Sequence, residues 1–418
     1  MKRTINDTVN IINEYIAKFG KDDKIKKLED NLSSLVNLSD FIYYAKNAKE
    51  VNFDSLENQI IESGNYDEIK SFASAISDIE SVNISKLEDA ICNSADPKYI
   101  YQFAFEVKNA DINKLEDAVC KAQDAEYIYY FARDIKGADI NKLTDAICNS
   151  QSAEYIYEFA QKVENADINK LTDAICKTQD IHSIFYFAKN IKNANIDKLT
   201  DAICNIQNTD DIEHIIYHAS YIYKFANEIK NADIDKLTDA ICETQDASYI
   251  FLFAHDIKGV DINKLTDAIC NSQSTEYIYE FAQKVKNADI DKLTDAICNS
   301  QNAKYIYRLA NNVENADIDK LTDAICKTQD ALYIYLFAHD IKNADINKLE
   351  DAVCKAQDAE YICYFARDIK GADIDKLQHA IHTLPNTYTN IKYLNILSKI
   401  SKKNKCIELE KEIDDLLK

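Results

Sequence analysis

Glycine, proline and tryptophan are scarce in this chain. Its 418 residues include five Gly, two Pro and no Trp. So few residues that turn or interrupt the backbone argue against long coil linkers and against a β-sandwich with many tight turns. No run approaches the about eighteen apolar residues of a membrane span, and we expect none. The N-terminus lacks the apolar core of a signal peptide, because Asn6, Asp7 and Asn10 interrupt it.

Basic residues are outnumbered by acidic ones. The chain has 49 Lys and Arg against 71 Asp and Glu, so its net charge is 49 − 71 = −22 with His neutral. The acidic residues are spread along the chain, which disfavours nucleic acid or an anionic membrane as a partner. A basic protein or peptide is compatible with this charge. Without a targeting signal, we expect a cytoplasmic protein in a reducing compartment.

Most of the chain is a tandem repeat. The phrase K-L-x-D-A-[IV]-C recurs every 28 residues, except for one interval of 38. Residues 127–140 return at 361–374 with a single difference. With weaker units at both ends, the sequence predicts about thirteen units. The phrase begins at Lys86, Lys114, Lys142, Lys170, Lys198, Lys236, Lys264, Lys292, Lys320 and Lys348.

The repeats define four regions. We predict an N-terminal capping helix region over 1–27, degenerate repeats over 28–85 and regular repeats over 86–376. The last repeat and the C-terminal capping helices occupy 377–418. Ten extra residues lie within 198–235, in the long interval of the repeat.

Each unit is predicted to form two short helices. Apolar residues recur with helical spacing over 140–149 and over about 125–136, and Asp139 and Asp124 precede these segments as N-caps. In ten repeats the position that follows the second helix is always Gly or Asn. These two residues adopt left-handed backbone angles at low cost. These positions are Asn109, Gly137, Asn165, Asn193, Asn231, Gly259, Asn287, Asn315, Asn343 and Gly371.

Two short helices cannot bury their apolar faces alone, whereas stacked helical hairpins can. The sequence therefore predicts an all-α fold, an α-solenoid capped at both ends. In architecture it resembles the tetratricopeptide, HEAT and armadillo class of repeat proteins. Its period is shorter than theirs and their signature residues are missing, so the resemblance implies a fold and no functional residue.

The candidate chemistry is sparse. One cysteine per repeat, from Cys92 to Cys354, suits a small buried apolar residue better than a metal ligand or a disulfide, because neighbouring units are about 10 Å apart. His214 and His218 stand four residues apart and could share a metal, although no third ligand is evident. Catalytic nucleophile motifs, phosphate loops and asymmetric carboxylate pairs are missing. We therefore predict no enzyme activity, no cofactor and no metal.

Two features could bind a partner. The Tyr-Ile-Tyr phrase of the second helix places an aromatic ring on each side of a core isoleucine. Two positions of the same helix vary between otherwise similar repeats. These positions are three residues apart, so their side chains would share one stripe. Neutral drift of solvated positions explains this variation equally well. The stripe is represented by Tyr130, Arg133, Glu158, Gln161, Lys224, Asn227, Leu252, His255, Glu280, Gln283, Arg308, Asn311, Leu336 and His339.

The ten-residue insertion is a third candidate contact. It lengthens a second helix, which we expect to begin as early as Asp210 with Thr209 as its cap. The added turns have no partner layer within the array. We therefore predict that residues 209–220 form a specific contact, with Ile212, His214, Ile215 and His218 as its candidate residues.

These features favour a non-catalytic scaffold that binds a protein or peptide along its long face. The alternative is an acidic mimic of nucleic acid, a decoy that inhibits a DNA- or RNA-binding defence protein of a host. Reading of single-stranded RNA, one base per repeat, fits the geometry and the tyrosines but conflicts with the charge.

Overall fold

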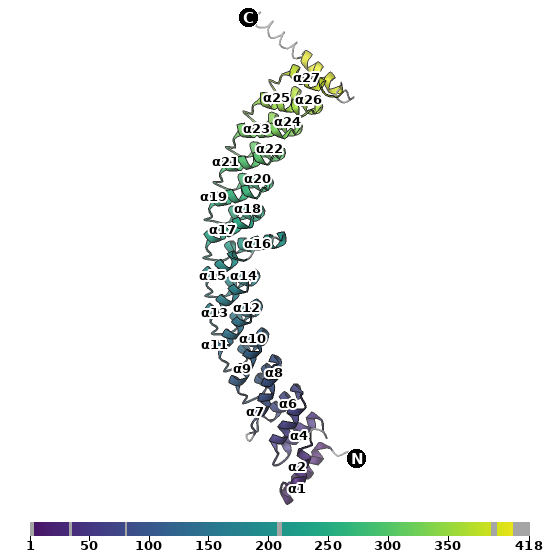
Figure 1. Cartoon of the computed structure of the whole chain (residues 1–418), viewed down its shortest axis with the longest axis vertical. Coiled ribbons are helices and arrows are strands. Elements are labelled where there is room, and N and C mark those ends of the chain that lie inside the picture. Colours follow the sequence, from purple (N-terminus) through teal and green to yellow (C-terminus); the bar gives the residue numbers. More distant parts are fainter. Residues whose placement is uncertain (1–3, 33–35, 80–81, 207–210, 386–390, 404–418) are drawn as a thin grey trace, which may run out of the picture. The chain divides into compact units, whose positions relative to one another are not determined.

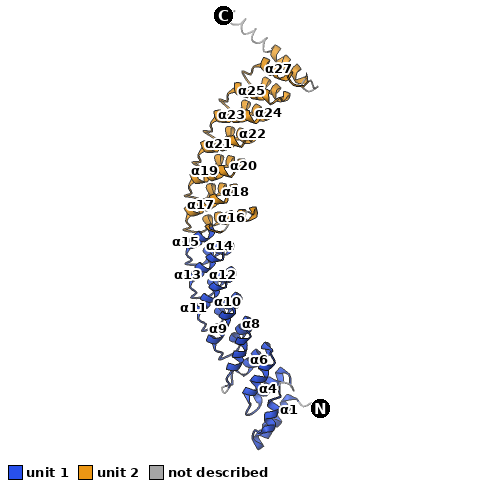
Figure 2. Cartoon of the chain, viewed as in Figure 1, with its two compact units in different colours: residues 1–203 blue, residues 204–418 orange. Residues whose placement is uncertain are grey.

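The computed structural model describes residues 4–32, 36–79, 82–206, 211–385 and 391–403, and these residues are helical or lie in short connections. The chain divides into two compact units, residues 1–203 and 204–418 (Figure 2). In both units helices follow one another in antiparallel pairs (Figure 1). The prediction of an all-α repeat fold is confirmed.

The first unit begins with helix α1, which lies within the predicted N-terminal region, and continues as helical pairs. Its helices are α1 (Ile5–Phe19), α2 (Asp23–Glu29), α4 (Leu38–Asn47), α5 (Phe53–Glu62), α6 (Tyr66–Ile76), α7 (Ser85–Asn93), α8 (Pro97–Glu106), α9 (Ile112–Ala122), α10 (Ala125–Asp134), α11 (Ile140–Asn149), α12 (Ala153–Lys162), α13 (Ile168–Lys177), α14 (Ile181–Asn190) and α15 (Ile196–Cys204).

The second unit repeats the same pairing after one longer helix. Its helices are α16 (Ile212–Glu228), α17 (Ile234–Thr244), α18 (Ala247–Asp256), α19 (Ile262–Asn271), α20 (Thr275–Lys284), α21 (Ile290–Asn299), α22 (Ala303–Asn312), α23 (Ile318–Thr328), α24 (Ala331–Asp340), α25 (Ile346–Lys355), α26 (Ala359–Asp368) and α27 (Ile374–His382). A helical segment over 391–403 follows, and the capping helix expected over 404–417 lies outside the described residues.

Within each unit the helices form two layers. From α4 onward in the first unit, even-numbered helices pack on even-numbered ones and odd-numbered on odd-numbered ones, and the second unit does the same. The core lies between the layers. Leu143 and Ile147 enter it from α11, and Ile128 and Phe131 enter it from α10, all fully buried. The Ile of each Tyr-Ile-Tyr phrase faces this core, as predicted.

Local signals explain where the helices begin. The Asp139 carboxylate accepts the backbone N–H groups of Asn141 and Lys142, and the Asp124 carboxylate accepts that of Tyr127. Both predicted N-caps are therefore confirmed. Such caps satisfy N–H groups that have no partner within the helix.

The second helix ends earlier than predicted. Helix α10 stops at Asp134, two residues before the expected end. Ile135 then turns to an extended conformation (φ −92°) and buries its side chain, and its N–H still bonds to the Phe131 carbonyl. Gly137 follows with φ of 85°. All ten predicted Gly and Asn positions have positive φ, but they form the turn beyond this buried apolar residue rather than the end of the helix itself.

A second left-handed position was not predicted. The first helix of most units is followed by a glutamine with φ between 53° and 59°. Because glutamine has no special preference for this conformation, its identity did not point to it. These glutamines are Gln123, Gln151, Gln179, Gln245, Gln273, Gln301, Gln329 and Gln357.

Candidate interaction surfaces

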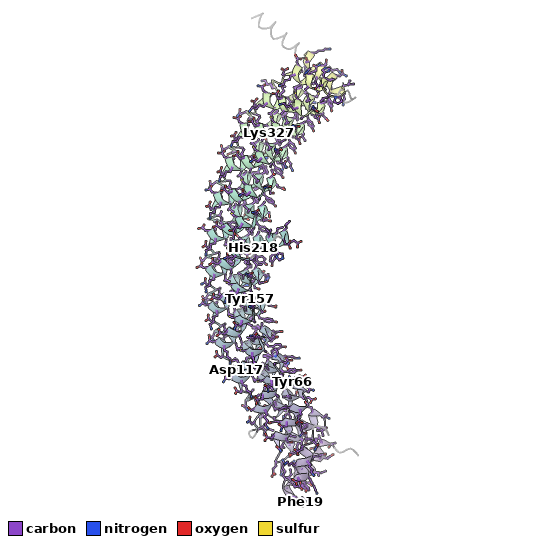
Figure 3. The ribbon with its side chains drawn as sticks, in the orientation of Figure 1. Phe19, Tyr66, Asp117, Tyr157, His218 and Lys327 are labelled. Carbon is purple, nitrogen blue, oxygen red and sulfur yellow. The ribbon has the colours of Figure 1, made fainter. Side chains whose placement is uncertain are left out.

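A ladder of tyrosines links neighbouring repeats along the even-numbered layer. The hydroxyl of Tyr101 in α8 donates to Asp134 Oδ2 at the end of α10, at 2.8 Å. Equivalent bonds join residues 33 apart in the second unit, with lengths of 2.5–2.9 Å: Tyr223 to Asp256, Tyr307 to Asp340 and Tyr335 to Asp368. Tyr157 in the first unit, labelled in Figure 3, accepts instead from the Asn190 amide at 2.8 Å. The second tyrosine of the Tyr-Ile-Tyr phrase therefore connects successive repeats.

The same aspartates bind the residue that precedes them. Arg133 forms a two-pronged ion pair with Asp134, in which both N···O distances are 2.7 Å. The Nδ1 atom of His255 lies 2.7 Å from Asp256 Oδ1. Every even-numbered helix from α8 to α26 that ends in Asp has Arg or His immediately before it. In these four repeats the residue at this stripe position therefore pairs with the aspartate that follows it.

Hydrogen bonding controls the ionisation of these groups. The bonds from Tyr223 and His255 hold the pKa of Asp256 below its usual value, although partial burial opposes them. The bond to Asp256 and burial together raise the pKa of Tyr223 to about 12. At neutral pH the Tyr223 phenol therefore stays protonated and donates to the ionised Asp256 carboxylate.

The structure places the predicted stripe on the surface of the even-numbered layer. Its two positions differ in accessibility: the first is half-buried in most units and the second is exposed. The half-buried members are Tyr130, Glu158, Leu252, Glu280 and Leu336, and the exposed members are Arg133, Gln161, Lys224, Asn227, His255, Gln283, Arg308, Asn311 and His339.

Several stripe residues already contact their own repeat. Lys224 lies over the ring of Tyr221, 4.6 Å from its centroid, and Glu280 pairs with Lys284 at 2.5 Å. The Gln161 amide donates to the Tyr157 hydroxyl at 3.2 Å. A partner that used this stripe would compete with these contacts.

The odd-numbered layer carries a ladder of ion pairs. The Lys of most K-L-x-D phrases reaches the Asp of the same phrase in the preceding repeat, as in Lys292 to Asp267 at 2.5 Å and Lys320 to Asp295 at 2.9 Å. Lys142 makes the same pair with Asp117, which Figure 3 labels in the first unit. The pairs are exposed and each adds little stability, but they neutralise part of the acidic surface.

The cysteines of the described residues are free thiols, but most are not fully buried as predicted. Those from Cys92 to Cys354 are half-buried, and Cys363 is the one buried cysteine of the described ranges. Their Sγ atoms lie between successive odd-numbered helices, where Cys176 donates to the Lys198 carbonyl at 3.6 Å. Partial burial still raises the pKa of most of these thiols to about 11, as at Cys148 and Cys326. The protonated thiol is a poor nucleophile and a poor metal ligand.

Helix α16 is the least regular part of the second unit. It begins at Ile212, and its cap is Asp211, whose carboxylate accepts the Glu213 N–H at 3.1 Å. The expected start at Asp210 and the cap Thr209 lie outside the described residues, and the observed cap replaces them. In Figure 1 the first turns of α16 extend beyond the ends of α18 and α20.

These first turns expose an apolar surface. Ile212 is 71% exposed, Ile216 42% and Tyr217 46%. His214 is exposed and Ile215 half-buried, whereas His218 is buried at the base of the projection (Figure 3). The two histidines therefore occupy different environments. Within the described ranges no group of three or more His, Cys, Asp or Glu side chains could hold a metal ion.

Comparisons with known proteins add no function. No protein-family model matches the chain, and no curated protein matches it. The crystal structure of an engineered protein from the Northeast Structural Genomics Consortium aligns over 96% of this chain and 97% of its own, at 11% identity with a TM-score of 0.17. A likeness this weak carries no argument. Among the described helices none is long and apolar enough to cross a membrane.

Proposed function

We propose that the protein is a non-catalytic helical-repeat scaffold that binds a protein partner through the projecting turns of α16. The observation that carries this proposal is the exposed apolar surface of Ile212, Ile216 and Tyr217. Exposed apolar side chains that gather on one element mark contact sites more often than scattered ones do. The stripe on the even-numbered layer would extend the contact.

The regularity of the remaining second unit supports this choice. The equivalent helices α18, α20, α22, α24 and α26 each span ten residues, whereas α16 spans 17. A repeat needs only the shorter length to fill its layer. The additional turns keep a capping aspartate, Asp211, although Ile212, Ile216 and Tyr217 of these turns are exposed.

The acidic-mimic alternative receives less support. A mimic of nucleic acid needs unpaired carboxylates along its surface, whereas the odd-numbered layer pairs one Asp per unit with a Lys of the next unit. Mimicry would also predict binding that is lost as salt rises, because ion pairs with a basic groove are screened.

Paired variants test the proposed contact. Ile212→Glu with Ile216→Glu changes the projecting turns, and Gln283→Glu with Gln161→Glu changes the stripe by the same charge. Both pairs of positions are exposed or partly exposed, so both variants should keep the wild-type circular dichroism. A partner found by affinity capture is then purified and titrated with each variant.

We expect the α16 variant to lose at least about tenfold in affinity, which is about 1.4 kcal/mol, with little effect of the stripe variant. Affinity that is equal for wild type and the α16 variant would exclude this contact. Affinity that collapses between low and high salt would favour mimicry instead.

A further inference from the structure

Buried glutamates recur at one position in the first helix of several repeats. Their contacts show how this fold stabilises a buried carboxylate. Glu88, Glu116 and Glu350 precede the Asp of the K-L-x-D phrase and are 1–3% exposed. Each carboxylate accepts the backbone N–H of the residue 23 positions later, at 2.8, 2.6 and 2.7 Å respectively. Most other units have Thr here, as at Thr144.

Each of these carboxylates also faces a lysine of the following unit. The Nζ atoms of Lys114, Lys142 and Lys376 lie 3.7, 3.1 and 2.7 Å from the carboxylates of Glu88, Glu116 and Glu350. A buried carboxylate is tolerated when it has such a counter-charge and hydrogen-bond donors. The following repeat therefore supplies both the counter-charge and the hydrogen-bond donor.

Glu57 in α5 occupies the same position without either donor. It is 2% exposed, yet it has no hydrogen bond and no ion pair with any residue in the described part of the chain. The sequence supplies the reason. Residues 55–58 read S-L-E-N instead of K-L-E-D, and the interval from Leu56 to Leu87 is 87 − 56 = 31 residues instead of 28. The lysine of the next repeat, Lys86, therefore follows Glu57 by 86 − 57 = 29 residues, whereas Lys114 follows Glu88 by 114 − 88 = 26.

Lys86, the lysine of the next repeat, pairs with a different carboxylate. Lys86 pairs with Asp54 at 2.8 Å, one turn before Glu57 on the same helix. Burial raises the pKa of Glu57 to about 7, an effect that the more distant charge of Lys86 only partly opposes. Asp54 adds to this rise, and the other charged groups that line the space around Glu57 are Lys46 and Glu50.

Glu57 lines a cavity of about 760 Å³ within the first unit. Val51, Phe53 and Ile79 provide apolar lining, and Asn52 and Asn83 add polar lining. The cavity thus combines a carboxylate for which the described part of the chain supplies no hydrogen bond with room for a small apolar chain.

We propose that this cavity binds a primary alkylammonium group, with Glu57 as its counter-ion. The equivalent glutamates of other repeats each face a lysine ammonium, and an alkylammonium reproduces that group with its charge and its three N–H donors. The apolar lining suits the methylene chain. The ligand supplies the charge and the donors that Lys114, Lys142 and Lys376 give to the other glutamates. The group belongs either to a free diamine or to a lysine side chain.

Calorimetric titration of the full chain at pH 8 tests this assignment with two probes. Putrescine represents a free diamine, and a Gly-Lys-Gly peptide with blocked ends represents a lysine side chain. Saturable binding of either probe is expected, and the probe that binds more tightly identifies the source. The absence of saturable binding for both probes at millimolar concentration would overturn the proposal.

Two substitutions locate the site. Glu57→Gln keeps the shape and removes the charge, and it should weaken binding by about tenfold or more. Glu57→Thr introduces the residue of most other units and guards against misfolding of the first variant. Glu116→Gln is the matched control in a satisfied position and should leave binding unchanged. Equal affinity of wild type and both Glu57 variants would overturn the assignment. The outcome is independent of the α16 variants, which lie in the other unit.

Discussion

The Tyr223 hydroxyl donates a 2.7 Å hydrogen bond to Asp256 Oδ2, across the boundary between two successive repeats. The same carboxylate binds His255 through its other oxygen at 2.7 Å. Asp256 therefore joins α18 to α16, the even-numbered helix of the preceding repeat. Since the pKa of Asp256 is lowered first of all by the tyrosine bond, this contact has a measurable energetic signature.

Removing that hydroxyl should destabilise the second unit. We expect Tyr223→Phe to lower the free energy of unfolding at pH 7 by about 0.5–1.5 kcal/mol, the net value of one hydrogen bond. Because the native pKa of Asp256 lies below its unfolded value, the stabilisation is present above the unfolded pKa and is lost as pH falls through the native pKa. Urea unfolding at pH 7 and at pH 3 measures the difference.

Phe251 offers a natural control for this substitution. It holds the equivalent position one unit later, and Lys284 lies over its ring, 5.8 Å from the centroid. Phe251→Tyr adds a hydroxyl opposite a lysine instead of an aspartate, so little gain in stability is expected. A gain equal to the loss in Tyr223→Phe would contradict the role given to Asp256.

Glu57 should make the first unit less stable at alkaline pH. Its native pKa of about 7 lies above the ordinary value of 4.5, so the folded state holds a proton that the unfolded state has released. Stability from this group is present below pH 4.5, falls as pH rises to about 7 and is then constant. Without added amine, Glu57→Thr should stabilise the chain at pH 8 by on the order of 1–3 kcal/mol, and by less at pH 5.

Glu116→Thr should have the opposite sign. It removes a carboxylate that accepts the Asp139 N–H and pairs with Lys142, and so it should destabilise by about 1–3 kcal/mol. Denaturant unfolding of both variants at the two pH values compares them directly. Destabilisation by both would mean that Glu57 is satisfied in the native protein.

The ladder cysteines should react slowly in spite of their exposure. With a pKa of about 11, as for Cys148 and Cys326, the thiolate fraction at pH 7.5 is lower than that of a free thiol by roughly two orders of magnitude. Alkylation with iodoacetamide, followed by intact mass, should be slow in the native protein and complete in denaturant. Rapid native labelling of many sites would show that the thiols are not held in their protonated form.

Removal of a whole repeat should be tolerated. Deleting residues 264–291 removes one 28-residue period, so each layer of the second unit closes on an equivalent surface. The ellipticity per residue should be unchanged. Deleting residues 264–277 removes most of α19 and the start of α20, leaves core residues of α20 without their partner, and should lower the ellipticity and the melting temperature. Identical behaviour of the two deletions would rule out the hairpin as the repeating unit.

Local signals in the sequence were sufficient for the helical pairs. Asp139 caps α11 because a short carboxylate reaches N–H groups two and three residues ahead, and the ends of this helix agree with the prediction. The Gly and Asn positions were recognised because left-handed angles restrict residue choice. The end of α10 was wrong by two residues because Ile135 prefers burial in an extended conformation over a further helical turn.

The sequence by itself determined the repeat, its period and the all-α fold, since periodic burial and capping are properties of residues that are close along the chain. Only the tertiary structure decided the state of groups whose partners lie in the next unit. Cys270 and Cys298 remain partly exposed because they line open pockets on the odd-numbered layer. Asp256 binds Tyr223 because stacking brings residues 33 apart together. Glu57 lacks the lysine partner that Glu116 has, because Lys86 of the next repeat pairs with Asp54 instead.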